Sequence, residues 1–155
     1  MPINSFLYPA KNVPVVYDVA NSCRFNDGDS GDLERSASDL NQQTFTISFW
    51  TKLGVSATGA VLAFYSGGDY FRLFFESGQF KMKSVVSAST VTQVKTTALF
   101  RDFSAWYNFV IRVDTTQGTA SNRIRFYVNG SEITSLAESD YPSQNYNLVT
   151  RHNLF

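Results

Sequence analysis

The sequence predicts an all-β protein in which short antiparallel strands form a sandwich of two sheets, of the jelly-roll type. Three observations predict this fold class. Short runs that alternate apolar and polar residues follow one another along most of the chain, and turns rich in Gly, Asn and Asp separate them. Helical periodicity is almost absent. Aromatic residues make up 15% of the chain, and their large side chains suit the space between two packed sheets.

Residues 1–20 are expected to form an extended arm. Pro2, Pro9 and Pro14 fall within it, and prolines at this spacing favour extended backbone over helix. Many of the residues between them are apolar, so the arm needs a surface to lie on. That surface belongs either to the chain's own sandwich or to a neighbouring subunit.

The sandwich is expected over residues 21–136, and its first loop is acidic. This loop, residues 26–32, contains Asp27, Asp29 and Asp32. Ca²⁺ binds several hard oxygen ligands from a flexible loop, which makes the three carboxylates the candidate metal ligands. Their spacing is not that of an EF-hand. Asp and Gly are also the residues of ordinary turns, so a structural turn without an ion is the alternative.

Six further segments have the composition or the alternation of strands. The clearest is residues 106–114, in which Tyr107, Phe109 and Val113 lie on one face and polar residues lie mostly on the other. Gly-containing turns separate several of the segments. The six are residues 44–52, 60–65, 70–76, 79–86, 90–99 and 106–114.

A tight hairpin is expected at Asn129 and Gly130. A polar loop, residues 115–122, leads into a second β-patterned run over residues 123–133 that contains this pair. Asn and Gly both accept the positive φ that the two central residues of a type I′ turn require. The sequence therefore predicts that the run folds back on itself at this point.

Composition excludes several classes of protein. The 13 Lys and Arg balance 13 Asp and Glu, which leaves no electrostatic footprint for nucleic acid and no polybasic membrane patch. Cys23 is the only cysteine, so no disulfide forms within the chain. The first residues carry no secretory signal, and no stretch is apolar enough to span a bilayer. We therefore expect a soluble protein made in a cytoplasm.

Several segments resemble a known family. Residues 105–110, a polar loop and then residues 124–130 are similar to the laminin-G-like branch of the concanavalin A-like lectin/glucanase sandwiches. Residues 21–28 and 44–52 lie where that family has its opening strand and a strand ending in Ser-x-Trp. The resemblance covers roughly residues 21–136. It implies the sandwich fold, which hosts lectins, glycosidases, adhesion modules and structural parts alike.

The same resemblance implies closing strands after the hairpin. Residues 137–155 are polar instead, and they are expected to form a loop or tail. The sandwich is therefore expected to be incomplete at its C-terminal edge. Either the chain is a fragment of a longer protein, or the open edge pairs with the arm or with a neighbouring subunit.

No catalytic residues are expected. The glucanase branch carries two catalytic carboxylates in Glu-x-Asp-x-x-Glu, and the nearest match here is Glu138 and Asp140, with Ser143 in place of the last Glu. Pro142 disfavours a central strand, so this segment is expected to be a solvated loop without an acid pair on a strand face. His152 is the only histidine and has no second His or Cys nearby with which to bind zinc. No cofactor is expected apart from the candidate Ca²⁺.

Asp69 and Tyr70 are the candidate ligand-binding residues. They adjoin two glycines between predicted strands, where a loop at the end of a sheet can present an aromatic face and a polar group together. An exposed aromatic ring stacks on the C–H groups of a sugar. Trp50 and Trp106 are expected in the core, as are most aromatic residues of such a sandwich.

The arm and several loops are similar to laminin-G-like modules of bacteriophage virion proteins, especially tail fibres. The similar segments are residues 4–9, 19–28, 100–107 and 113–123. This resemblance implies a non-enzymatic virion protein, made in the host cytoplasm, that acts as a tail fibre or capsid decoration subunit. It also implies a homo-oligomer that contacts other virion proteins through residues 1–20 and displays its sandwich to a host surface glycan. The alternatives are a carbohydrate-binding module of a cellular protein and a glycosidase.

Overall fold

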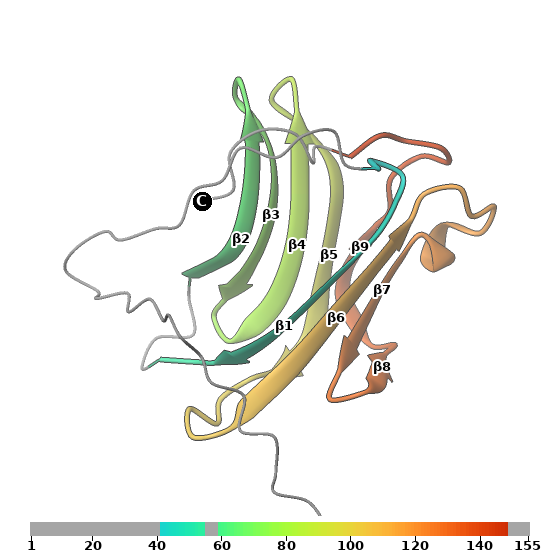
Figure 1. Cartoon of the computed structure of the whole chain (residues 1–155). Coiled ribbons are helices and arrows are strands. Elements are labelled where there is room, and N and C mark those ends of the chain that lie inside the picture. Colours follow the sequence, from blue (N-terminus) through green and yellow to red (C-terminus); the bar gives the residue numbers. More distant parts are fainter. Residues whose placement is uncertain (1–40, 55–58, 149–155) are drawn as a thin grey trace, which may run out of the picture. The chain divides into compact units, whose positions relative to one another are not determined.

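Two antiparallel β-sheets pack face to face in the computed structural model, which describes residues 41–54 and 59–148 (Figure 1). One sheet has the strand order β1-β6-β7-β8 and the other has the order β2-β3-β4-β5-β9. The expected all-β sandwich is thereby confirmed. The elements are β1 (Thr44–Lys52), β2 (Gly59–Ser66), β3 (Asp69–Glu76), β4 (Gln79–Val86), β5 (Ser89–Leu99), β6 (Trp106–Asp114), the short 3₁₀ helix η1 (Ala120–Asn122), β7 (Ile124–Val128), β8 (Ser131–Ile133) and β9 (Leu136–Asp140).

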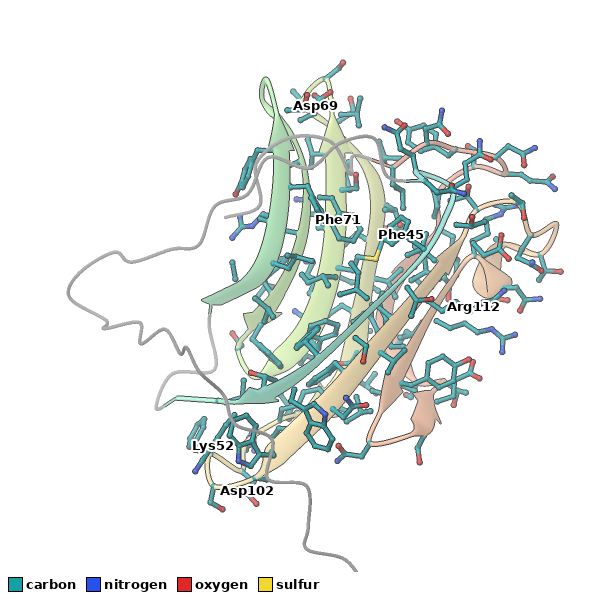
Figure 2. All side chains as sticks on the ribbon, viewed as in Figure 1. Phe45, Lys52, Asp69, Phe71, Asp102 and Arg112 are labelled. Carbon is teal, nitrogen blue, oxygen red and sulfur yellow. The ribbon has the colours of Figure 1, made fainter. Side chains whose placement is uncertain are left out.

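The six strands predicted between residues 44 and 114 are all present, each within one residue at either end. Their alternation fixes which side chains lie between the sheets. Phe80 of β4 and Phe109 of β6 meet across that space with ring centroids 4.5 Å apart. Phe45 and Phe71, labelled in Figure 2, meet edge to face at 5.9 Å. The core is therefore rich in aromatic rings, as the composition predicted, and its largest fully buried side chains include Phe71, Phe80, Phe109, Phe126, Leu73, Met82 and Ile111.

The predicted hairpin joins β7 to β8. Asn129 and Gly130 both have positive φ, 50° and 81°, and Val128 pairs with Ser131 across the turn. Asn129 is also fixed to β6, because its Oδ1 accepts a hydrogen bond of 2.9 Å from the backbone N–H of Asn108. The hairpin prediction is confirmed.

The segment predicted as a loop or tail, residues 137–155, is in part a strand. Residues 137–140 belong to β9, which pairs antiparallel with β5 at the edge of the five-stranded sheet, so the prediction is wrong for these residues. Pro142 follows the last paired residue, and its missing N–H therefore interrupts no ladder. The strand has almost no apolar pattern to reveal it, because Leu136 is its one side chain that packs against the core. This closing strand is short, since its register with β5 spans residues 93–96 alone.

Thr115 fixes the chain that follows β9 to the rest of the sandwich. Its side chain is fully buried, and its Oγ1 donates a hydrogen bond of 2.8 Å to the backbone carbonyl of Tyr146. Its backbone N–H donates to the carbonyl of Gln43 at 2.9 Å, and its carbonyl accepts from the N–H of Asn145 at 2.8 Å. Leu148 is buried in the core. The described residues beyond β9 are therefore part of the packed domain.

Candidate functional site

Asp69, one of the two predicted ligand-binding residues, holds a turn. Its Oδ1 accepts a hydrogen bond of 2.8 Å from the backbone N–H of Ser87. Ser87 and Ala88 form the turn between β4 and β5 and both have positive φ, which is costly for residues other than glycine. Asp69 also borders a pocket of about 190 Å³, whose other lining residues are Gln42, Ser66, Val86, Tyr146, Asn147 and Leu148.

Tyr70, the second predicted residue, does not line that pocket. It alternates with buried Phe71 and so lies half-buried on the outer face of the five-stranded sheet, where Tyr65 is its cross-strand partner at 6.0 Å between ring centroids. The structure thus places Asp69 and Tyr70 in two different surroundings. A ligand site built on both remains a prediction.

A half-buried arginine lies between two aromatic rings on this outer face. Tyr70, Arg72 and Phe74 alternate with buried residues of β3 and therefore point the same way. The guanidinium carbon of Arg72 is 6.0 Å from the ring centroid of Tyr70 and 5.1 Å from that of Phe74, within cation–π range of both. Its Nε–H is buried and meets no hydrogen-bond acceptor among the described residues. Arg72 thus contacts two aromatic rings but has no hydrogen-bond partner for this donor among the described residues.

Lys83 stands directly opposite Arg72. The two residues are register partners in the β3–β4 pair, so both side chains lie on the outer face. Lys83 is half-buried, and neither residue has an ion pair within the described part of the chain. We refer to them as the Arg72–Lys83 pair.

A second pair of cations on the same face is neutralised. Lys81 and Lys95 are also cross-strand partners, but Glu76 and Glu138 lie beside them. Lys81 Nζ is 2.9 Å from Glu138 Oε2, and Lys95 Nζ is 2.8 Å from Glu76 Oε2. The hydrogen bond from Lys95, followed by the charge of Lys81, holds the pKa of Glu76 below its usual value. We call Glu76, Lys81, Lys95 and Glu138 the charge network.

The two described tryptophans are exposed, and the prediction that they lie in the core is wrong. Trp50 retains 66% of its accessible surface and Trp106 retains 60%. Lys52 pairs with Trp106 and Trp50 pairs with Asn108 in the β1–β6 ladder, so the two indoles are diagonal neighbours on the outer face of the four-stranded sheet. We refer to Trp50 and Trp106 as the tryptophan pair.

The alternation of inward-facing and outward-facing residues along β1 and β6 is the signal in the sequence that identifies the tryptophan pair. Phe49 faces the core from β1, and Tyr107 does so from β6. A residue next to an inward-facing one must point outward, since successive strand residues alternate between faces. Trp50 and Trp106 each adjoin such a residue, so the strand pattern places both outside, whereas the general preference of tryptophan for the core misplaces them.

The candidate catalytic carboxylates lie on one strand. β9 places Glu138 and Asp140 two residues apart and hence on the same side, which corrects the expectation of a loop without an acid pair on a strand face. Glu138 is engaged by Lys81 in the charge network. Within residues 41–54 and 59–148, no three His, Cys, Asp or Glu side chains cluster closely enough to hold a metal ion, and no helix is long and apolar enough to cross a membrane. The candidate calcium ligands Asp27, Asp29 and Asp32 lie outside the described residues.

A second pocket, of about 210 Å³, opens where β8 and β9 meet the core. Its apolar lining includes Val94, Phe126 and Leu136, and Arg125 and Glu132 are the charged residues beside it. Arg125 donates hydrogen bonds to Glu132 at 3.2 Å and to Asn122 at 2.7 Å. The two terminal nitrogens of Arg125 are thus engaged, whereas its buried Nε–H has no acceptor among the described residues.

Comparisons with known proteins agree with this architecture. The family model described as the concanavalin A-like lectin/glucanases superfamily, of laminin-G type, matches residues 26–151. Domains LG4-5 of the mouse laminin alpha1 chain superpose with a TM-score of 0.53 at 14% identity, over 76% of this chain and 28% of the laminin structure. At that identity the superposition shows the fold alone, and this chain spans about a quarter of the structure it matches. A comparison of the sequence with curated proteins found no match. Because the family model covers most of the chain, the protein belongs to the laminin-G-like family of the concanavalin A-like lectin/glucanase superfamily.

Proposed function

We propose that this chain is a non-catalytic glycan-binding subunit of a bacteriophage virion, in a tail fibre or a capsid decoration, and that the tryptophan pair is its sugar-stacking surface. The exposure of Trp50 and Trp106 is the observation that carries the glycan-binding part. A folded domain ordinarily buries most of a tryptophan, so two neighbouring exposed indoles need a partner. Membership of a lectin-containing superfamily supports the same function.

The surroundings of the pair suit a sugar. Each indole offers a flat apolar face to the C–H groups of a pyranose ring, and the neighbouring side chains Lys52 and Asn108 offer polar groups for its hydroxyls. Lys52 and Asp69 lie at opposite ends of the sandwich (Figure 2), so this surface is separate from the loop at Asp69 that was proposed from the sequence.

Binding is tested by electrophoresis of the full chain through gels that contain host surface polysaccharide. Trp50→Ala/Trp106→Ala should lose at least about tenfold in affinity, since each stacking aromatic contributes about 1 kcal/mol. Leu99→Ala is the matched control, because Leu99 is also exposed, at 44%, but lies on β5. Equal retardation of the double variant and the parent would refute the tryptophan pair as the binding surface.

The absence of catalysis is a separate part of the proposal. It is supported by the ion pair between Glu138 and Lys81, which holds one of the two candidate carboxylates at a lysine. Incubation with the same polysaccharide should release no reducing ends. Steady release that disappears in Glu138→Gln/Asp140→Asn would establish a glycosidase instead.

Residues 1–20 are proposed to anchor the subunit to other copies and to other virion proteins. The proline-spaced apolar sequence and the resemblance to phage modules support this assignment. Deletion of residues 1–20 should abolish the oligomer in sedimentation while leaving the thermal unfolding transition of the sandwich in place. A truncated chain that still assembles as the parent does would refute the anchor, and a parent that is monomeric and absent from particles would favour a module of a cellular protein.

Calcium binding by Asp27, Asp29 and Asp32 is proposed on the chemistry of the loop, which offers three carboxylates. Millimolar Ca²⁺ should raise the thermal midpoint of the parent, and Asp27→Asn/Asp29→Asn/Asp32→Asn should remove that increase. Asp69→Asn is the control, since that carboxylate serves a turn. An increase that persists in the triple variant would place the ion elsewhere.

A further inference from the structure

We propose that the Arg72–Lys83 pair is a second ligand site, on the opposite sheet from the tryptophan pair, and that it binds the carboxylate or sulfate groups of an acidic polysaccharide. The site follows from the side chains of β3 and β4 and does not depend on the function proposed for Trp50 and Trp106. It adds a requirement for negative charge on the ligand.

Repulsion within the pair is the first argument. Like charges directly opposite each other in a sheet destabilise it, and Arg72 and Lys83 are such partners. The neighbouring cations Lys81 and Lys95 are arranged in the same way, but Glu76 and Glu138 neutralise them. The outer face of one sheet therefore carries one cation pair with acids and one without.

No acid of the described chain lies close enough to fill that role. Along the row of register partners, Gln93 follows Lys83 and Asp140 follows Gln93. Asp140 lies two strands from Lys83, as Glu138 does from Lys81, but only Glu138 and Lys81 form an ion pair. The row therefore lacks an anion among the described residues, and the proposed ligand supplies one.

The surroundings of the Arg72 side chain suit the binding of such an anion. The rings of Tyr70 and Phe74 lie within cation–π range of the guanidinium, and its Nε–H has no acceptor in the described chain. A half-buried guanidinium competes less with water for an oxyanion than an exposed one does. The ammonium group of Lys83 adds a second donor across the strand pair.

A polysaccharide fits this surface better than other anionic polymers do. Arg72 and Lys83 line neither of the two pockets described above and stand in the middle of a sheet face, which suits an extended chain. The flanking rings of Tyr70 and Phe74 suit pyranose rings beside the acid group. Nucleic acid binding relies on many phosphate contacts, and the chain as a whole has no net positive charge.

The test measures the affinity of the full-length protein for four probes in low salt. These are polygalacturonate with carboxylates, dextran sulfate with sulfates, neutral dextran, and a single-stranded oligodeoxynucleotide. The parent should bind at least one of the two acidic polysaccharides more tightly than neutral dextran, and Arg72→Gln or Lys83→Gln should weaken that binding about tenfold each, because charge-assisted hydrogen bonds are lost. Whichever acidic probe is preferred identifies the acid group.

Arg101→Gln is the matched control. Arg101 is an exposed cation outside the strands and has no ion pair in the described part of the chain, so its loss changes net charge equally without touching the site. Equal weakening by Arg101→Gln and Lys83→Gln would mean general charge attraction and would overturn the site. Tighter binding of the oligonucleotide than of both polysaccharides, with the same sensitivity, would overturn the ligand class.

Two further readouts separate this site from the tryptophan pair and from misfolding. Trp50→Ala/Trp106→Ala should leave the preference for the acidic over the neutral polymer unchanged, so either proposal can fail alone. Lys83→Gln should unfold at the same or a higher temperature than the parent without ligand, because it relieves the repulsion from Arg72. A lower unfolding temperature for Lys83→Gln would show that the lysine has a structural partner and would overturn the argument.

Discussion

Lys81 of β4 and Glu138 of β9 lie far apart in the sequence, and yet their Nζ and Oε2 atoms are 2.9 Å apart on the outer face of the five-stranded sheet. β5 runs between the two strands, so the ion pair reaches over a neighbour. Only 7% of the Lys81 side chain is exposed. The short edge strand β9 is therefore held by an ion pair as well as by its ladder with β5.

Lys81→Met should destabilise the domain. The substitution keeps most of the buried methylene stem but leaves Glu138 without its cation, while Glu76 keeps Lys95. We expect this loss to cost about 1–3 kcal/mol in the free energy of unfolding. Urea unfolding measures the effect. Lys83→Met is the matched control on the same strand and face, and it should cost little, because Lys83 has no acidic partner in the described chain. Equal losses in the two variants would show that the ion pair contributes nothing.

Stability should fall in acid partly through Glu76. Its pKa is lowered in the folded state from the usual 4.5, first by the hydrogen bond from Lys95. A carboxyl group with a depressed folded pKa stabilises the fold above the unfolded pKa, and this contribution disappears as the pH falls from about 4.5 through the folded value. Glu76→Gln should therefore lose stability at pH 7 and show a shallower decline between pH 5 and pH 3 in urea titrations. Parallel pH profiles for variant and parent would contradict the assignment.

The turn between β7 and β8 should reject a β-branched residue at position 130. Gly130 has φ of 81°, so Gly130→Val should cost about 1–3 kcal/mol of stability by forcing strain or shifting the register of the hairpin. Gly118→Val is the control, because Gly118 has no positive φ and a Cβ added there would meet no atom within 4 Å. Thermal unfolding compares the two, and similar midpoints would show that the turn tolerates both.

Removal of the tryptophan pair should leave the fold intact. Exposed side chains contribute little packing, so Trp50→Ala/Trp106→Ala should change the free energy of unfolding by less than about 1 kcal/mol. Phe109→Ala, which empties the centre of the core, should cost about 3–5 kcal/mol. Guanidinium unfolding gives both values. A loss in the double variant as large as that for Phe109→Ala would mean that the indoles are structural.

Local sequence patterns were sufficient to predict much of the fold. Alternation with a period of two residues, apolar or β-prone runs and the turns between them located the six strands between residues 44 and 114, and Asn129-Gly130 located the hairpin. These features depend on residues close together in the chain, which is why a single sequence reveals them. Because Trp50 and Trp106 each adjoin an inward-facing residue, the same alternation also indicates that both point outward. The general preference of tryptophan for the core led to the opposite prediction.

Other features depended on which strands become neighbours. β9 has little pattern of its own and is a strand because β5 offers it an edge. The opposition of Arg72 and Lys83 and the meeting of Lys81 with Glu138 follow from the register of the strands, which irregularities shift at two places between β4 and β5. The sequence alone determined the six strands between residues 44 and 114, the hairpin turn and the alternation of side chains along those strands. The tertiary structure decided which charges meet and which remain unpaired, because pairing between distant strands is set by the packing of the whole core.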